Sequence, residues 1–256
     1  MDIPRLYRRL GIEEPQDIDL DVIARYLGLT IKTGRLRACE ARIIGLGDRG
    51  IITISETAHH LRRRFSIAHE IGHWVYHRGK ALMCRASDIG EGREISRHRE
   101  QVADAFASRL LMPDFMLKAR SDFPKLTFKQ VEKVSADFKV SLTATARRLV
   151  ETGHFPSILI YYDRTGRKWF ARSPMLPEHW FPQKDIDPES GTFEAVFAGK
   201  ASTYPSKIGA DAFFDRWGSD RFEVLEESIC TGSGEALTLV TITDQRMLED
   251  AGFRRR

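Results

Sequence analysis

The sequence predicts an α+β protein in three parts: residues 1–125 with helices and a short sheet, a helical connector at 126–155, and a β-rich region at 156–256. Three observations lead to this prediction. The apolar residues of the first part recur mostly with the period of a helix, and one short run alternates as a strand does. Two helical patterns follow each other closely in the connector. Beyond Phe155 the apolar period changes to two, which is typical of strands.

The first part is expected to place a short sheet among amphipathic helices. Residues 19–29, DLDVIARYLGL, have the apolar spacing of a helix, and residues 49–55, RGIITIS, alternate as a strand. A second helix contains FSIAHEIGHWVYH at 65–77. A third runs through SRHREQVADAFASRLL at 96–111 and ends before Pro113, because proline cannot continue a helix.

The connector is expected to form a helical pair. Residues 126–153 predict two helices joined by a turn at 139–141, where Ser141 is a candidate N-cap. Part of the pair resembles the middle of a helix-turn-helix, with Arg147 and Arg148 expected on the surface. Two interpretations stay open: DNA recognition, and a structural extension that helps to seat a substrate.

The third part is expected to be a domain of short strands separated by Gly, Pro and Asp turns. A short helix is possible at residues 211–217. Such a domain suits a small-molecule sensor or a surface for substrate recognition, and the sequence does not separate the two. The expected strands are residues 157–162, 168–173, 192–197, 221–228 and 236–243.

Composition limits the class of protein. With 256 residues, 42% of them hydrophobic, the chain can bury a core, and 40 basic against 36 acidic residues force no acidic partner. Direct DNA binding is therefore allowed but not implied. The odd, scattered set of Cys39, Cys84 and Cys230 is typical of reduced thiols. Because the sequence has no signal-peptide pattern and no apolar run near 18 residues, we expect a cytoplasmic protein with no membrane partner.

Within residues 65–77, the sequence HEIGH places two histidines four residues apart. On a helix, positions i and i+4 share one face, so His69 and His73 can direct their rings at one point, as zinc ligands do. Glu70 is rotated about 100° from His69, which suits a general base better than a ligand. The alternative is a surface helix with two solvated histidines.

A catalytic zinc ion needs a third protein ligand and one open position. One class of zinc peptidase has a glycine three residues and a histidine six residues past HExxH, but Tyr76 and Gly79 stand there, so that class is excluded. His77 follows His73 by one turn and is expected to be poorly aimed at the same ion.

A carboxylate on the next helix is the better candidate for the third ligand. In EQVAD, Glu100 and Asp104 again lie one turn apart. Glu100 could complete the coordination, while Asp104 could accept the other ring N–H of a zinc-bound histidine. The alternative is a solvated acidic pair. What favours the site is that the opposite face of this helix is apolar and predicts packing by that face.

The order of these motifs resembles the zinc metallopeptidases of the ImmA/IrrE family. The strand IITIS is followed by RRRFSIAHEIGH, a spacer and EQVADAFASRLLMP. The family pattern is roughly R-x-F-[ST]-x-A-H-E-x-G-H followed by E-x-x-A-[ND]-x-F-A-x-x-L-L-M-P. The resemblance spans about residues 15–120. It is specific because two separate motifs agree in order, spacing and flanking residues.

The resemblance implies a zincin-like fold with one zinc ion per chain, held by His69, His73 and Glu100, with Glu70 as the catalytic base. Asp104 stands where the family often has asparagine. Family members cleave helix-turn-helix repressors of the XRE-like kind, so the resemblance implies a protein substrate of that kind. Cleavage would derepress stress-response or mobile-element genes. Two rivals stay open: a DNA-binding regulator and a catalytically silent metal-binding sensor.

Three further expectations concern the surroundings of the site. Tyr76, Arg63 and Arg64 are candidates for stabilising the oxyanion, and the sequence selects none of them. The strand at 49–55 could bind the substrate by β-augmentation if it lies at a sheet edge. Cys84 is expected to be a buried thiol, with metal binding or a redox switch as alternatives.

Overall fold

The computed structural model describes residues 1–36, 39–78, 92–202, 204–216 and 218–249, with the side chains of 92–96 excepted. It contains helices and two separate sheets, so the predicted α+β class is confirmed. Residues 1–120 with 135–141 form one compact unit, and residues 121–134 with 142–256 form the other. The predicted boundaries at 125 and 155 stay a prediction, because compactness does not define what folds independently.

Among the residues that the structure describes, no helix is both long and apolar enough to cross a bilayer.

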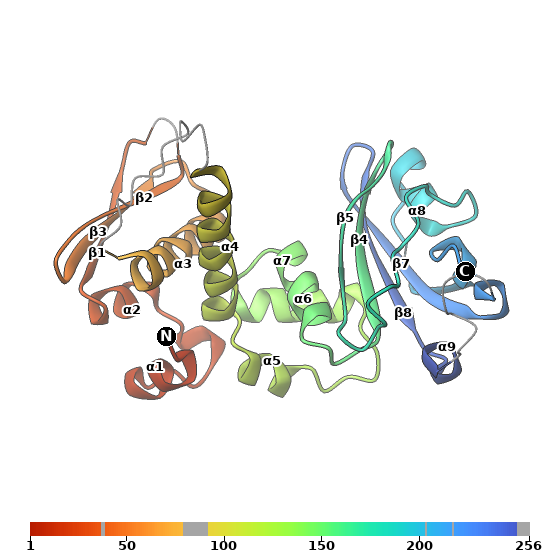
Figure 1. Ribbon diagram of the computed structural model, residues 1–256, viewed down its shortest axis with the longest axis horizontal. Coiled ribbons are helices and arrows are strands. Elements are labelled where there is room, and N and C mark those ends of the chain that lie inside the picture. Colours follow the sequence, from red (N-terminus) through yellow and green to blue (C-terminus); the bar gives the residue numbers. More distant parts are fainter. Residues whose placement is uncertain (37–38, 79–91, 203, 217, 250–256) are drawn as a thin grey trace. The chain divides into compact units, whose positions relative to one another are not determined.

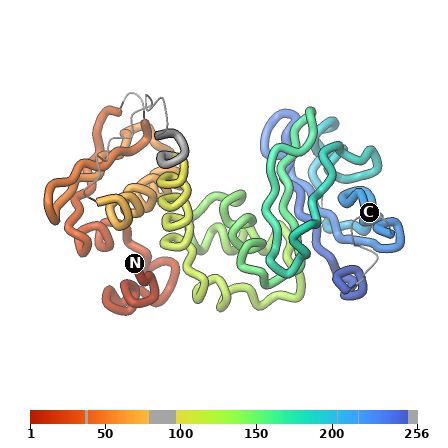
Figure 2. The backbone as a smooth tube through the Cα atoms, viewed as in Figure 1, coloured from red at the N-terminus to blue at the C-terminus, as the bar shows by residue number. Residues whose placement is uncertain are grey.

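The first unit is built from a small sheet and a pair of packed helices. The strands are β1 (Leu29–Gly34), β2 (Ala41–Leu46) and β3 (Arg49–Ser55). The helices are α1 (Ile3–Leu10), α2 (Leu20–Tyr26), α3 (His60–His77), α4 (Gly92–Leu111) and α5 (Asp114–Arg120), with a 3-10 turn at Pro15–Asp17. Helix α1 was not among the predicted elements. Figures 1 and 2 show α3 and α4 side by side, with α3 between α4 and the sheet.

Strand β3 is the middle strand of the sheet, whose order is β1-β3-β2. It pairs in parallel with β1 and antiparallel with β2. Its buried residues Ile52 and Ile54 lie on the face that packs against α3, and Ile51 faces outward. The expectation that residues 49–55 bind a substrate by β-augmentation is therefore wrong, because both sides of β3 are already paired. The outer strands of this sheet, as far as the described residues go, are β1 and β2.

The second unit is an antiparallel sheet covered on both faces. Its strand order is β5-β4-β8-β7-β6. Successive residues Ser157 to Ile160 of β4 are all buried, which requires cover on both faces. The strands are β4 (Ser157–Asp163), β5 (Gly166–Arg172), β6 (Ser206–Gly209), β7 (Glu223–Gly232) and β8 (Glu235–Ile242).

Helices and turns supply that cover. Helix α7 (Leu142–Glu151) packs on β4 and β5, whereas α8 (Gly191–Phe193) and the π-helical turn Glu194–Ala198 pack against β7 and β8. The core on this second face includes Trp180, Phe213 and Phe214. A 3-10 turn spans Ala210–Ala212, another Ser219–Arg221, and α9 spans Gln245–Glu249.

Two predicted elements of this unit are wrong. Residues 192–197 are helical, because Thr192, Ala195 and Val196 are buried at helical spacing and Ser190 caps the first turn by accepting from the N–H of Phe193. The possible helix at 211–217 shrinks to the short 3-10 turn among the described residues. Strand β6 was not predicted. Its four residues are exposed or half-buried and give no alternation to detect.

The helical pair of the connector is confirmed. Helix α6 (Phe128–Phe138) and α7 are joined by a turn in which Lys139 adopts φ +52°. Arg147 is exposed and forms an ion pair with Glu151 at 2.7 Å, as predicted for a surface residue. The same prediction is wrong for Arg148, whose side chain is buried. Because α7 packs on the sheet, Arg148 lies on its covered side.

Candidate metal centre

The candidate site lies where α3 and α4 cross closely in the first unit. A methyl group added at Gly72 would lie 3.1 Å from both the Cα and the carbonyl oxygen of Ala103, so any larger residue would push the two helices apart by a few tenths of an ångström. Gly72 directly precedes His73, and Ala103 directly precedes Asp104. The close crossing therefore brings the histidines of α3 to the acidic residues of α4.

Three of the predicted site residues converge on one point. The Nε2 atoms of His69 and His73 lie 3.0 Å apart. The carboxylate of Glu100 lies 3.2 Å from His69 Nε2 and 3.3 Å from His73 Nε2. Among the described residues, these three form a group whose possible ligand atoms all lie within 4.8 Å of one another, and His77 does not belong to it.

This donor set fits a zinc ion. Two imidazole nitrogens and one carboxylate oxygen are the ligands of one common class of catalytic zinc site. With bonds of about 2.0–2.1 Å, tetrahedral ligand atoms lie about 3.3–3.4 Å from each other. The separations of 3.0, 3.2 and 3.3 Å are close to that distance. His73 is buried, whereas the side chain of Glu100 is 44% exposed, so the group is open on one side.

Glu70 is a buried carboxylate beside these donors. It is 4% exposed, and its Oε2 atom has no hydrogen-bond partner among the described residues. Burying such an oxygen without a partner costs about 1–3 kcal/mol or more, so a fold retains it only under some other constraint. A reacting group that completes the site would supply the missing partner.

The position of Glu70 along α3 places it toward β2. It occupies the centre of a row of residues at four-residue spacing whose other members contact β2 or its flanks. Next to Glu70 in the row, Trp74 fills the space beside Gly45 of β2. The hydrogen bonds of the row join Arg62 and Ser66 to the carboxylate of Glu40, and Arg78 to the carbonyl of Gly47. Glu70 therefore lies on the side of α3 that packs against β2, next to the metal-ligand histidines.

The protonation of the group reflects its mixture of burial and ion pairs. Burial lowers the pKa of His69, but hydrogen bonds to Asp104 and Glu100 outweigh it and raise the pKa to about 9. Hydrogen bonds from His69 and His73 hold the pKa of Glu100 far below its ordinary value. Burial raises the pKa of Glu70, although both histidines oppose the rise. Without a metal ion, His69 is thus a cation at pH 7, and its proton must leave for the ring to bind one.

Each histidine has a partner on its other ring nitrogen. The Nδ1 atom of His69 lies 2.8 Å from the carboxylate of Asp104, and the role of Asp104 in metal binding stays a prediction. The Nδ1 atom of His73 lies 3.0 Å from Nδ1 of His77, a contact that the sequence did not predict. The signal for it was present, because His77 follows His73 by the same four residues that separate His69 from His73.

The three candidate oxyanion donors make their hydrogen bonds elsewhere. The hydroxyl of Tyr76 accepts from the amino group of Met1, Arg63 donates to Thr33, and Arg64 donates to the carbonyl of Ile18. None of these hydrogen bonds reaches the histidines. Cys84 lies outside the described residues.

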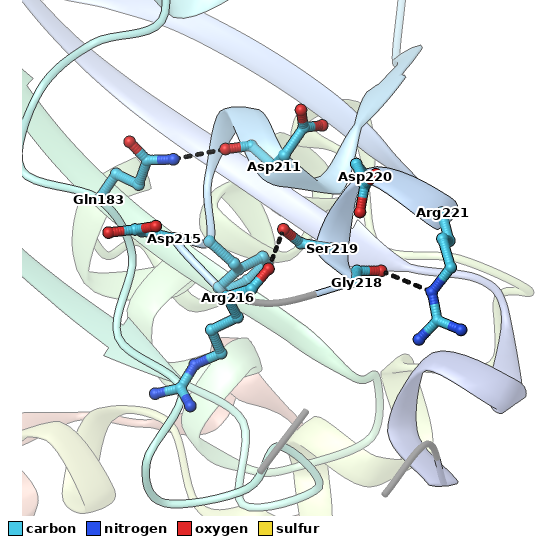
Figure 3. Close-up of a pocket in the computed structure, with 9 residues that line it drawn as sticks. Gln183, Asp211, Asp215, Arg216, Gly218, Ser219, Asp220 and Arg221 are labelled. Atoms are coloured by element: carbon cyan, nitrogen blue, oxygen red, sulfur yellow. Dashed lines mark hydrogen bonds between the residues drawn. The ribbon is translucent and has the colours of Figure 1, made fainter. Parts of the chain in front are cut away.

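The second unit contains an open cavity of about 570 Å³. Figure 3 shows carboxylates and guanidinium groups around it, including Asp211, Asp215 and Arg216. Both carboxylates are exposed, and the hydrogen bonds drawn in Figure 3 join neighbouring parts of the cavity wall. No strongly desolvated acid or base lines this cavity among the described residues, so it does not compete with the group on α3 and α4 as a reactive site.

Fold and site together define the class: a zincin-like α+β domain of the metallopeptidase type. Comparison with protein families narrows this further. The model of peptidase family M78, described as the IrrE N-terminal-like domain, matches residues 16–150. This match covers more than half of the chain, and the chain belongs to that family, which confirms the resemblance found in the sequence.

The fold has a counterpart among solved structures. A Mycobacterium tuberculosis transcriptional regulator is similar with a TM-score of 0.57, and the match covers 96% of this chain and 88% of that chain. The two sequences are 14% identical, so the likeness concerns the fold alone. No curated protein matches the chain. The family implies a peptidase that uses a metal ion, typically zinc, while the roles of the individual residues stay predictions.

Proposed function

We propose that this protein is a zinc-dependent endopeptidase that cleaves a helix-turn-helix transcriptional repressor and thereby derepresses stress-response or mobile-element genes. The observation that carries the proposal is the convergence of His69, His73 and Glu100 beside buried Glu70, whose Oε2 atom has no hydrogen-bond partner among the described residues. The family membership supports a peptidase in general. The repressor as substrate rests on the resemblance of the two motifs.

Zinc, when bound, supplies Lewis-acid polarisation of a carbonyl and lowers the pKa of water to about 7. The chain supplies the ligands and the base. His69 and His73 would hold the ion through Nε2, and Glu100 would hold it through its carboxylate. The free Oε2 of Glu70 accepts the proton of the attacking water and later returns it to the leaving amine. Burial raises the pKa of Glu70, which brings it closer to that of a base used near neutral pH.

The substrate would bind in extended form at the open edge of β2. Among the described residues β2 pairs with β3 alone, and Glu70 lies on the side of α3 that contacts β2. A peptide added to that edge would gain main-chain hydrogen bonds, and its scissile bond would have to reach the metal-ligand group. A repressor segment must unfold locally to adopt this form.

A DNA-binding regulator is the second candidate, and it is favoured by the fold's similarity to a Mycobacterium tuberculosis protein described as a transcriptional regulator. The geometry of α7 weighs against it. A recognition helix needs one free face to enter the major groove. In α7, Ala146, Leu149 and Val150 are buried, Arg148 is covered, and Arg147 is paired with Glu151. The silent metal-binding sensor differs from the peptidase only in activity, so a cleavage assay separates these two.

The test is to incubate the protein with the helix-turn-helix repressor encoded beside it, with zinc or with a chelator, and to identify fragments by mass spectrometry. We expect one defined cleavage that needs zinc. Glu70→Gln should abolish it while zinc is still bound at one equivalent. Glu100→Gln should lose zinc and cleavage together.

Glu13→Gln is the matched control, because it removes an exposed carboxylate from the same unit. It should cleave like the wild type. Undiminished cleavage by Glu70→Gln would refute the peptidase. Zinc binding without cleavage of any repressor would favour the sensor. DNA affinity that survives zinc removal and is lost in Arg147→Ala would favour the regulator.

A further inference from the structure

The last residue of α3, His77, is a buried histidine in direct contact with one of the metal-binding histidines. It is 6% exposed, and His73 is 3% exposed. Their Nδ1 atoms lie 3.0 Å apart, and their rings are inclined by 50° with centroids 5.2 Å apart. This is hydrogen-bond distance between two atoms of the same kind.

Such a contact is attractive only if one nitrogen carries a proton and the other does not. The Nε2 atom of His73 faces His69 and Glu100, so its lone pair is the one that a metal ion would use. A neutral imidazole that offers Nε2 to a metal carries its proton on Nδ1. His73 is therefore the donor of this hydrogen bond, and His77 accepts with a bare Nδ1.

We propose that His77 is a positioning residue that fixes the tautomer and the ring orientation of His73, as Asp104 does for His69. The proposal rests on the proposed metal site. It assigns His77 a role without making it a fourth ligand, because its Nδ1 meets the side of the His73 ring that faces away from the ligand group. The Nδ1 atoms of the two histidines then have different hydrogen-bond partners. His69 has the carboxylate of Asp104, and His73 has the neutral imidazole of His77.

The difference has a functional consequence. A carboxylate partner adds negative charge next to its histidine, whereas a neutral imidazole orients its partner without adding charge. His77 supplies orientation alone and leaves the charge on the metal side unchanged.

The test compares zinc affinity, measured by competition with a chromophoric chelator, in variants of His77. His77→Leu keeps an apolar volume but removes the acceptor, and zinc should bind about 10–100-fold more weakly. His77→Asn places an amide oxygen near the position of Nδ1, and it should recover most of that loss. The control is His60→Leu, which changes an exposed histidine at the other end of α3 and should bind zinc like the wild type.

A second measurement uses the wild type and does not depend on how the variants fold. In the zinc-loaded protein, long-range ¹H–¹⁵N correlation spectra should show a proton on Nδ1 of His73 and on Nε2, but not Nδ1, of His77. A protonated Nδ1 on His77 would overturn the proposal. So would a His77→Leu protein that folds and binds zinc with unchanged affinity.

The two proposals fail in different ways. Zinc binding with the expected tautomers but no cleavage would defeat the peptidase and leave the role of His77 intact. Cleavage that His77→Leu leaves unaltered, at zinc concentrations near the dissociation constant, would defeat the role of His77 alone. A wild type that binds no zinc would defeat both.

Discussion

The two compact units each bury a glutamate, and the two carboxylates are treated in opposite ways. In the second unit, Glu226 is 1% exposed and accepts hydrogen bonds from the N–H groups of Gly191 and Thr192 and from the hydroxyls of Thr192 and Ser228, at 2.6–3.1 Å. In the first unit, Glu70 is 4% exposed and keeps one oxygen without a partner among the described residues.

The difference separates a structural carboxylate from one available for chemistry. The hydrogen bonds of Glu226 hold the start of α8 against β7, and they leave no capacity for a further partner on Oε1. Glu70 instead stores an unfavourable contact in the folded state. Such a cost is common where a side chain is kept for reaction and not for stability.

The largest expected effect is on cleavage activity, which should depend on Glu70 but not on Glu226. Glu70→Gln should reduce repressor cleavage by about 10²–10⁴-fold, because the amide cannot take a proton from water. Glu226→Gln, an equally conservative change at an equally buried position, should leave the rate per folded molecule unchanged. Initial rates of fragment formation measure both. If both variants lost activity equally, the loss in Glu70→Gln would be a general effect of replacing a buried glutamate. Glu70 would then not be the base.

The next effect is on the free energy of unfolding, which the loss of Glu226 should lower and the loss of Glu70 should not. Glu226→Ala leaves several N–H and hydroxyl donors without an acceptor and should lower the free energy of unfolding by about 2–4 kcal/mol. Glu70→Gln should not lower the stability of the metal-free protein and should raise it by about 1 kcal/mol, since it removes a desolvated charge. Urea titrations followed by circular dichroism check both, with the exposed Glu223→Ala as the control. A Glu70→Gln protein as destabilised as Glu226→Ala would make Glu70 a structural residue too.

A smaller effect concerns the outer support of the site. Asp104→Ala removes the carboxylate that lies 2.8 Å from Nδ1 of His69, and zinc affinity should fall about 10-fold or more. Asp104→Asn retains an acceptor oxygen and should lose less. Both variants are measured by chelator competition at one pH. If Asp104→Ala binds zinc like the wild type, the contact with His69 does not support the metal site.

The sequence predicted the α+β class and the convergence of the candidate site residues, but not the pairing of the strands around them. His69 and His73 could be named as candidates because they lie one helical turn apart. Glu100 and Asp104 could be named because they repeat that spacing on the next helix and because the two motifs together resemble a known family. What failed were features set by tertiary contacts. Strand β3 is central because it pairs with β1 on one side and with β2 on the other. The sequence contains little sign of β2, because Ile44 and Leu46 of that strand are exposed. Local alternation cannot report which strand lies at an edge.

The same limit explains the errors in the second unit. The stretch 192–197 alternates like a strand, yet the carboxylate of Glu226, 34 residues away from Thr192, binds its first N–H groups and starts a helix. The sequence predicts Arg148 on the surface because arginine is rarely buried. In the structure the sheet packs against α7, and the side chain of Arg148 is buried. His77 was set aside as a ligand, and the contact that gives it a role became visible only in three dimensions.

The smallest expected effect tests a third buried glutamate, Glu227, whose environment lies between those of the other two. It is 7% exposed, and its carboxylate accepts from the N–H of Phe128 at the start of α6, at 2.7 Å. Burial raises the pKa of Glu227 above 4.5, against the opposing effects of that hydrogen bond and of Lys125.

The folded state therefore binds the proton of Glu227 more tightly than the unfolded state. The contribution of that proton to stability is lost as the pH rises from about 4.5 through the folded pKa. In Glu227→Gln this loss should disappear, so the variant gains stability relative to the wild type across that window, by less than the effect of Glu226→Ala. Urea titrations at several pH values measure the difference, with Glu223→Gln as the exposed control on the same strand. A wild-type stability that rises relative to Glu227→Gln over the same window would show that the hydrogen bond to α6 outweighs burial, which would group Glu227 with Glu226 and leave Glu70 as the exception among the three.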